Sequence, residues 1–256
     1  MENNIPPNPD FAKIKSEYFH FVKEFRKKLI FTLIIFVIAT FTGFIFYEKI
    51  IAFLIDLLSL EGINIVFTSP FQFINLSISC GVAIGLITVF PILVAQILSF
   101  SKPALKRNEF KMVTRFLPYC LILFLIGFAL GAYIMKWQIE IFLVRASALG
   151  IGNVLDISRL LSTILLTSTF MGVGFQFPII LILLMRLRII SPQQLGKKRS
   201  WIYLGSFIFA ILLPVDSVLA DIFLSLPLIL LFEVTLLIGY LYEKKRVKAT
   251  EEIVSR

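Results

Sequence analysis

Long apolar runs alternate along this chain with short polar segments. A membrane-spanning helix needs about 20 consecutive, mainly apolar residues, and several of the runs reach that length. We expect transmembrane helices at about 29–47, 71–98, 116–135, 160–185, 201–213 and 222–242. The pattern predicts an all-α integral membrane protein with six transmembrane helices, forming a single membrane domain over residues 1–256.

The fifth of these runs is short. Trp201 to Leu213 holds 13 residues before Pro214, which corresponds to a helix of roughly 20 Å at 1.5 Å per residue. The hydrocarbon core of a bilayer is about 30 Å thick. We therefore expect either a locally thinned membrane at this helix or a recess lined by protein.

Apolar positions also recur at helical spacing in segment 1–28, with cations mainly between them. The apolar residues are Phe11, Ile14, Tyr18, Val22, Phe25 and Leu29. This pattern predicts an amphipathic helix that lies on the membrane interface before the first span.

Composition and charge support a membrane location and predict an orientation. Charged residues make up 16% of the chain, against about 25% in soluble domains. All but four of the 25 Lys and Arg residues lie in 1–28, in the loops after the second and fourth spans, or in the tail 243–256; the exceptions are Lys49, Lys136, Arg145 and Arg159. Cytoplasmic loops are enriched in Lys and Arg, so both termini are predicted to be cytoplasmic. The net charge of +9 follows from this topology, and no nucleic-acid partner is needed to explain it.

Small residues and prolines predict details of helix packing. Gly81 and Gly85 are four residues apart in the second span, and Gly127 and Gly131 in the third. Such pairs let two helices approach closely. The prolines expected to kink spans are Pro91, Pro178 and Pro227.

The sequence offers little for catalysis. The single histidine, His20, lies outside the spans, and the two cysteines, Cys80 and Cys120, lie within them. No nucleophile has a paired base, and no phosphate-binding loop or metal-ligand spacing is present. We expect neither an enzyme nor a bound cofactor or metal. A small-molecule secondary transporter is the alternative class, but it predicts an internal repeat and an ionic site at the membrane midplane.

Two acids stand out at the predicted cytoplasmic face. Glu109 lies in a loop with five cations, which are Lys102, Lys106, Arg107, Lys111 and Arg115. Taken alone, Glu109 could partly neutralise this basic loop or could bind a cationic ligand. Glu24 lies in the basic N-terminal segment, where it could pair with Lys27 or Lys28 at helical spacing.

Several segments, in chain order, resemble the TatC family, whose members are the multispanning core of the twin-arginine protein translocase. The resemblance runs from about residue 17 to 245. The matching segments are His20-Phe-Val-Lys-Glu24-Phe-Arg26-Lys-Lys-Leu29, Thr68-Ser69-Pro70, Phe100-Ser-Lys-Pro103-Ala-Leu-Lys-Arg-Asn-Glu109, Gly174-Phe175-Gln176-Phe177-Pro178, Ser191-Pro192-Gln-Gln-Leu195-Gly-Lys-Lys-Arg199, and Pro214-Val-Asp216 followed by Pro227 and Leu231-Phe232-Glu233.

The resemblance implies a fold and a function. The fold would be a concave, cup-like bundle whose last two spans are short. The function would be export of folded proteins across the plasma (inner) membrane, driven by the proton-motive force. The implied partners are twin-arginine signal peptides, single-span subunits of the TatA and TatB type, further TatC copies and the lipid bilayer.

The resemblance also assigns roles to individual residues. Signal-peptide binding would involve Glu24, Arg26, Phe100, Pro103 and Glu109; partner docking or lining of the cup would involve Gln176, Asp216 and Glu233. Gln176 replaces the more usual glutamate of the family, so it can form hydrogen bonds but no ion pair.

Each of these residues also has a simpler interpretation. Phe100 and Pro103 could only shape a helix end, and Asp216 could cap the sixth span. Gln176 and Glu233 could bond a neighbouring helix.

Overall fold

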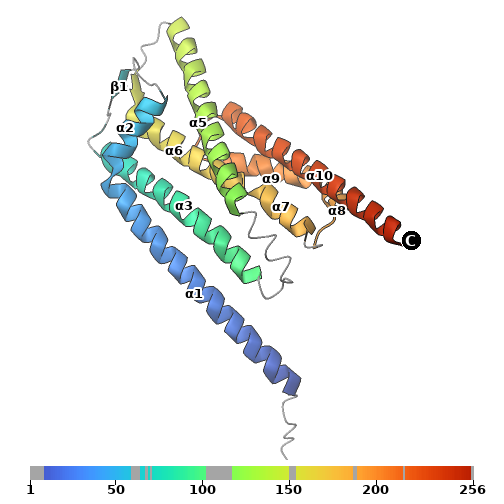
Figure 1. The fold of residues 1–256 in the computed structure, drawn as a ribbon. Helices are drawn as coiled ribbons and strands as arrows, with labels where there is room; N and C mark the ends of the chain where they lie inside the picture. The colour runs from blue at the N-terminus through green and yellow to red at the C-terminus, as the bar shows by residue number, and fades with distance from the viewer. Residues whose placement is uncertain are drawn as a thin grey trace, which may run out of the picture.

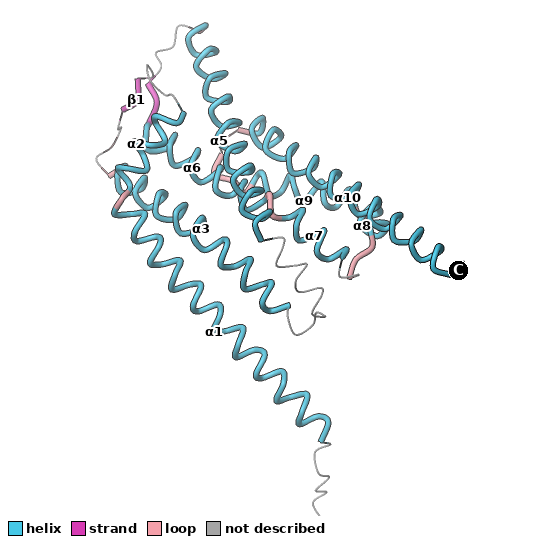
Figure 2. Tube along the Cα trace, viewed as in Figure 1, coloured by secondary structure: helices cyan, strands magenta, loops and turns pink. Residues whose placement is uncertain are grey.

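The computed structural model describes residues 9–58, 64–66, 69, 71–101, 117–149, 154–186, 189–215 and 217–254. Its helices are α1 (Pro9–Ile45), α2 (Tyr47–Leu58), α3 (Gln72–Ser101), α5 (Leu117–Ala148), α6 (Ile157–Gly174), α7 (Phe177–Arg186), α8 (Pro192–Lys197), α9 (Arg199–Ile211) and α10 (Val218–Val254); two short strands are β1 (Asn64–Val66) and β2 (Val154–Asp156). The all-helical membrane architecture predicted from the sequence is confirmed, with helices filling nearly all of the described chain (Figures 1 and 2).

Five segments of the described chain are long and apolar enough to cross a membrane: 26–45, 72–94, 118–146, 157–186 and 218–244. Each coincides with a predicted span. The predicted fifth span corresponds to α9, which has only 13 residues. The structure therefore supports five full-length spans and one short apolar helix, and it does not confirm a count of six spans.

Two boundaries differ from the prediction. The final span is not short, because it belongs to α10, a helix of 37 residues. The third span was predicted to end at residue 135, whereas α5 continues to Ala148. In both cases the helix continues past the end of the apolar run, because the residues that follow include good helix formers such as Glu, Lys, Arg and Ala.

The N-terminal helix is continuous. The predicted interfacial segment and the first span both lie in α1, which runs without a break from Pro9 to Ile45 (Figure 1). Residues 10–42 contain no glycine or proline that would interrupt a helix. A separate interfacial helix is therefore not confirmed.

Glycines allow the close helix pairs that the sequence predicted. A Cβ atom on Gly81 would lie 2.6 Å from the carbonyl oxygen of Thr40, and one on Gly131 would lie 2.9 Å from the Cα atom of Ser168. These contacts join α3 to α1 and α5 to α6, the two most extensive helix pairs of the described chain. Backbones pack this closely only where a side chain is missing.

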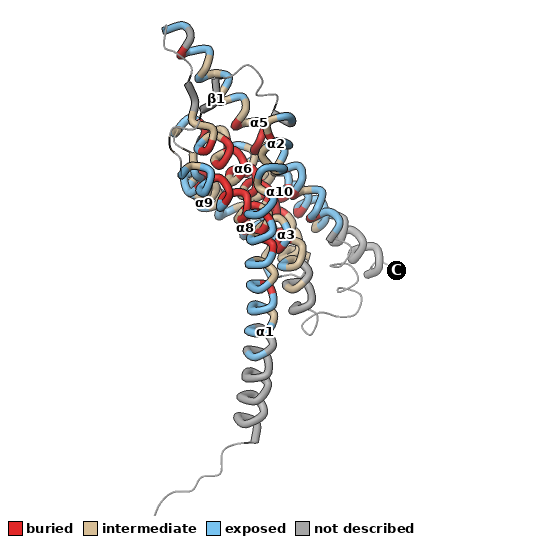
Figure 3. Tube along the Cα trace, turned by 90° about the vertical axis from the view of Figure 1, so that its left-hand side faces the viewer, coloured by how far each residue is buried: buried red, intermediate tan, exposed pale blue. Residues whose placement is uncertain are grey.

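The buried core lies where α3, α5, α6 and α10 meet. One cluster is centred on Leu76, Leu161 and Ile164, and a second on Met171 and Leu224. Figure 3 shows the buried residues gathered there, whereas the described part of α1 is largely exposed. Many Leu, Ile and Phe side chains remain exposed on the outer helix faces, as expected for surfaces that contact lipid.

A feature absent from the sequence prediction closes one end of the bundle. β1 and β2 pair in parallel, with Ile65 opposite Leu155. Next to them the side-chain amide of Gln72 donates to Asp156, and the Ser158 hydroxyl donates to the carbonyl oxygen of Gln72 at 2.9 Å. Strands of three residues carry no readable alternation of apolar and polar positions, so the sequence did not reveal them.

Candidate functional site

Cations of the described chain gather at the end of the bundle opposite the β1–β2 pair. This basic end contains Arg26, Lys27 and Lys28 on α1, Arg186 on α7, Lys197 on α8, Lys198, Arg199 on α9 and Lys244 on α10. The first half of α1 and the C-terminal ends of α3, α7 and α10 lie on this side of the molecule, away from β1 (Figure 1). Residues far apart in sequence thus lie at the same end of the molecule.

Of the residues expected to bind a signal peptide, the structure describes Arg26 fully, and it is exposed. Glu24 lies in α1 and Phe100 in the last turn of α3, with both side chains outside the described part. Pro103 and Glu109 lie outside the described residues, within 102–116. The relation between α1 and α3 follows from the backbone register of the two helices.

A hydrogen bond sets that register. The Thr32 hydroxyl on α1 lies 2.8 Å from Gln96 Oε1 on α3 and 3.0 Å from the carbonyl oxygen of Lys28. The two helices run in opposite directions. A residue a given number of positions after Gln96 on α3 is therefore level with the residue the same number of positions before Thr32 on α1. Phe100 is then level with residue 28. Phe100, near the end of α3, therefore lies about 6 Å along the helix axis from the level of Glu24.

Gln176 lies in a break between α6 and α7. Its side-chain amide donates to the carbonyl oxygens of Gly172 and of Cys120 on α5, each at 3.1 Å. Backbone N–H groups of Phe175 and Gln176 bond the carbonyls of Met171 and Val173. The last carbonyls of a helix have no partners within the helix, and here a turn and one side chain supply most of them.

Gln176 is 5% exposed, so its side chain is an interhelical amide within the bundle. Its Oε1 atom has no hydrogen-bond partner among the described residues. An amide can donate to carbonyl oxygens, whereas an ionised carboxylate can only accept. The geometry thus suits glutamine better than a charged glutamate.

Of the three prolines expected to kink spans, only Pro178 lies next to a break, and α3 and α10 continue through Pro91 and Pro227.

Glu233 joins α10 to the short helix α9. Its carboxylate accepts a hydrogen bond from the Tyr203 hydroxyl and lies 3.5 Å from the guanidinium of Arg199. The rings of Tyr203 and Phe232 are also in contact and nearly perpendicular, with centroids 6.1 Å apart. The Glu233 side chain is 38% exposed, so an acid in the final span is paired and still reachable from outside.

The local sequence explains why α9 begins at a position where Arg199 can pair with Glu233. Ser191 caps α8 through a hydrogen bond with the backbone of Gln194, and the Gln194 side chain bonds back to Ser191. Pro192 occupies the first turn of α8, where a missing N–H costs nothing. The turn at Lys198 then places Arg199 at the beginning of α9.

The third residue expected to dock partners, Asp216, lies outside the described residues. A nearby acid, Asp221, is 8% exposed in the first turn of α10. Its Oδ1 atom has no hydrogen-bond partner in the described part of the chain. The positive end of a helix dipole stabilises an acid at this position, a role that the sequence alone did not distinguish from a solvated acid.

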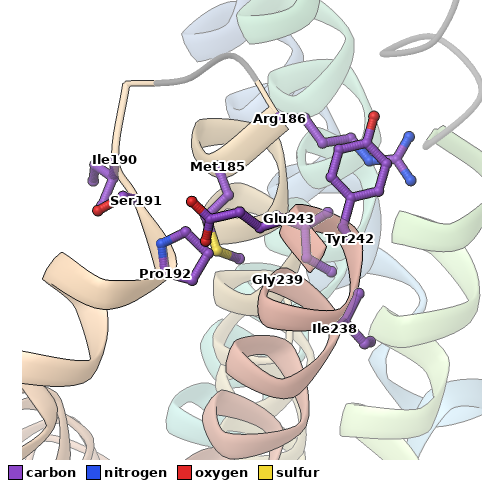
Figure 4. A pocket seen from close by; sticks show the side chains of 10 residues that line it. Met185, Arg186, Ile190, Ser191, Pro192, Ile238, Gly239, Tyr242 and Glu243 are labelled. Atoms are coloured by element: carbon purple, nitrogen blue, oxygen red, sulfur yellow. The ribbon is translucent and has the colours of Figure 1, made fainter. Parts of the chain in front are cut away.

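The sequence analysis also missed a cluster at the basic end, between α7 and α10. The guanidinium of Arg186 lies over the ring of Tyr242, 4.9 Å from its centroid. Gln193 donates to Glu243 at 2.6 Å, and in Figure 4 the Glu243 carboxylate points to the opposite side of α10 from Arg186. Stacking depends on the tertiary packing of α7 against α10, so no spacing in the sequence indicated it.

Comparisons with known proteins agree with this arrangement. Residues 20–227 match the family described as Sec-independent protein translocase protein (TatC). The chain is 30% identical over 226 residues to TatC of Listeria innocua, covering 85% of this chain and 89% of that one. It is 28% identical over 235 residues to TatCy of Bacillus subtilis, covering 90% and 91% of the two chains.

A solved structure is similar over most of the chain. The crystal structure described as the twin arginine translocase receptor TatC in DDM superposes with a TM-score of 0.75 at 25% identity, covering 86% of this chain and 99% of that one. The match extends over most of the described bundle. The chain therefore belongs to the TatC family and is a non-enzymatic, multispanning membrane component of the Sec-independent, twin-arginine protein translocase.

Proposed function

We propose that this protein binds the twin-arginine signal peptides of folded substrate proteins at the cytoplasmic face of the plasma membrane. The observation that carries the proposal is the α1–α3 register set by Thr32 and Gln96. This register supports the proposal because it brings the end of α3, from which the chain leads toward Glu109, to within about one helical turn of the level of Glu24. Two acids at one basic surface suit a ligand with two adjacent arginines.

The chemistry favours arginine over lysine. A guanidinium forms two parallel hydrogen bonds with a carboxylate, whereas an ammonium acts as a point charge. Each charged hydrogen bond contributes about 1.5–3 kcal/mol. The surrounding cations oppose the approach of a cationic peptide at long range, so the selectivity arises from close contact geometry.

We further propose that both termini lie in the cytoplasm and that the bundle scaffolds single-span subunits of the TatA and TatB type. The concentration of Lys and Arg at one end of the bundle supports this orientation. Glu233 is the described candidate for a direct contact, because it is partly exposed. Gln176 is buried and is assigned to holding the α6–α7 break in place.

The alternative of a small-molecule secondary transporter is not favoured. Such a protein holds a charged site near the bilayer midplane. Glu233 is instead half-exposed and paired with Arg199, and the family of this chain is a protein translocase.

Crosslinking tests the receptor assignment. A signal peptide with a photoreactive group beside its two arginines is bound to membranes that contain the full chain. We expect Glu24→Ala and Glu109→Ala each to reduce the crosslink by at least about tenfold. The control variant Glu251→Ala, which removes another acid at the same end of the molecule, leaves the crosslink unchanged. A two-lysine peptide crosslinks weakly to all forms. Undiminished crosslinking in both Glu24→Ala and Glu109→Ala overturns the proposal.

A further inference from the structure

A groove between α5, α7 and α10 opens beside the Arg186 cluster. Its volume is about 520 Å³, within the range of roughly 300–1,000 Å³ typical of ligand pockets. Apolar side chains line most of it, among them Leu123 of α5, Ile179 of α7 and Val234 of α10. The polar residues that line it are Tyr119, Arg186 and Thr235.

The groove has a direction relative to the membrane. Arg186 is the last residue of α7, at the basic end, and Pro178 lines the groove eight residues earlier. At 1.5 Å per residue the groove therefore follows α7 for about 12 Å. It descends from the level of the basic surface toward the middle of the bundle. The cation at the basic end of the groove matches the phosphate of a phospholipid, and the apolar wall nearer the middle of the bundle matches an acyl chain.

The positive charge of Arg186 suits a phosphate at this end of the groove. Tyr242 covers a face of the guanidinium, whereas the five N–H donors of the group lie in its plane. Stacking also holds the side chain in one orientation, which reduces the entropy lost when it binds an anion. Arg186 and Ile182 are shared with a second hollow of about 260 Å³ that Met185, Ser191 and Glu243 line (Figure 4). Arg186 therefore stands at the junction of the two.

We propose that this groove binds one anionic phospholipid, with its phosphate on Arg186 and an acyl chain along Leu123, Ile179 and Val234. Charge complementarity selects the headgroup, because basic sites between transmembrane helices on the cytoplasmic side favour anionic lipids. The apolar wall selects the chain. Assignment of the lipid to the cytoplasmic leaflet rests on the proposed orientation, whereas binding itself is independent of signal-peptide recognition.

Native mass spectrometry tests the proposal on the full chain. The protein is reconstituted in nanodiscs with equal amounts of phosphatidylglycerol and phosphatidylcholine, released, and examined for retained lipid. We expect the unaltered protein to retain phosphatidylglycerol preferentially. Arg186→Gln reduces this preference by about tenfold, and Arg186→Lys restores part of it. Lys244→Gln, an exposed cation on α10 that does not line the groove, leaves the preference unchanged.

A second pair of variants tests the apolar part of the groove. Val234→Trp fills the space of the acyl chain and lowers retention of both lipids. Leu230→Trp, one turn earlier on α10, places the same bulk at an exposed position that does not line the groove and has no effect. Unchanged lipid retention in Arg186→Gln, or an equal loss in Lys244→Gln, overturns the proposal. A crosslink from Val234→Cys to a single-span protein, with lipid retention unaffected by Val234→Trp, also overturns it and assigns the groove to a helix.

Discussion

The side-chain amide of Gln176 donates a hydrogen bond to the carbonyl oxygen of Cys120 at 3.1 Å, and so ties the break between α6 and α7 to α5. The same amide group bonds Gly172, at the end of α6. In a bilayer no water replaces such bonds, so an interrupted span requires partners from within the protein. The Gln176 side chain therefore both satisfies a carbonyl oxygen at the break and links α6 to α5.

Replacement of Gln176 by leucine leaves the carbonyls of Cys120 and Gly172 without this donor. We expect Gln176→Leu to lower stability by about 1–3 kcal/mol, measured by thermal unfolding in detergent. Gln176→Glu has a similar effect in its ionised form, because a carboxylate cannot donate. Gln193→Leu is the control, because it removes a hydrogen bond to Glu243 that is exposed rather than buried, and we expect a smaller loss of stability.

The same variant bears on partner docking. If Gln176 positions the surface to which a single-span subunit binds, Gln176→Leu also weakens co-purification of that subunit. Normal recovery of the subunit, together with lowered stability, identifies Gln176 as a packing residue only.

Gly81 lets α3 approach α1. A Cβ atom there would lie 2.6 Å from the backbone oxygen of Thr40, so Gly81→Ala forces the two helices apart. We expect a loss of about 1–3 kcal/mol, measured by unfolding. Gly205→Ala is the matched control, because nothing lies within 4 Å of a Cβ atom at that position of α9. Equal stability of the two alanine variants would show that the α1–α3 contact is looser than described.

Arg199 and Glu233 pair across α9 and α10. Both side chains are partly exposed, at 48% and 38%, so we expect a coupling free energy of only about 0.2–1 kcal/mol. A double-mutant cycle with Arg199→Gln and Glu233→Gln measures it. The charge-swapped pair Arg199→Glu with Glu233→Arg restores this coupling. Co-purification of the single-span partner is measured on the same variants. Loss of the partner in the charge-swapped protein indicates that Glu233 contacts it directly, whereas normal co-purification contradicts such a contact.

Asp156 begins α6 and accepts a hydrogen bond from the backbone N–H of Arg159 at 3.1 Å. It also accepts one from Gln72, at the start of α3. Asp156→Ala removes both, and we expect it to cost about 0.5–2 kcal/mol for the cap alone. Asp156→Asn retains a capping oxygen and loses less. Hydrogen exchange of the first turn of α6 measures the difference, and equal exchange in both variants would count against the cap.

The sequence was sufficient to predict the spans, the close helix contacts and the family of this protein. Apolar runs located five full-length spans because only a helix satisfies its own backbone within a bilayer. The fifth run, 201–213, was correctly judged too short, and α9 has that length. Gly81 and Gly131 indicated close helix contacts because a missing side chain acts locally. Ordered motifs indicated the family before any geometry was considered.

Only the tertiary structure decided which groups meet. The pairing of Arg199 with Glu233 joins residues 34 positions apart, and the bonds of Gln176 depend on how α5 crosses the α6–α7 break. The extent of α10 was also missed, because helical backbone continues past the end of an apolar run. Apolar pattern reports burial and membrane contact along one element, whereas pairing, stacking and groove formation depend on how separate elements pack together.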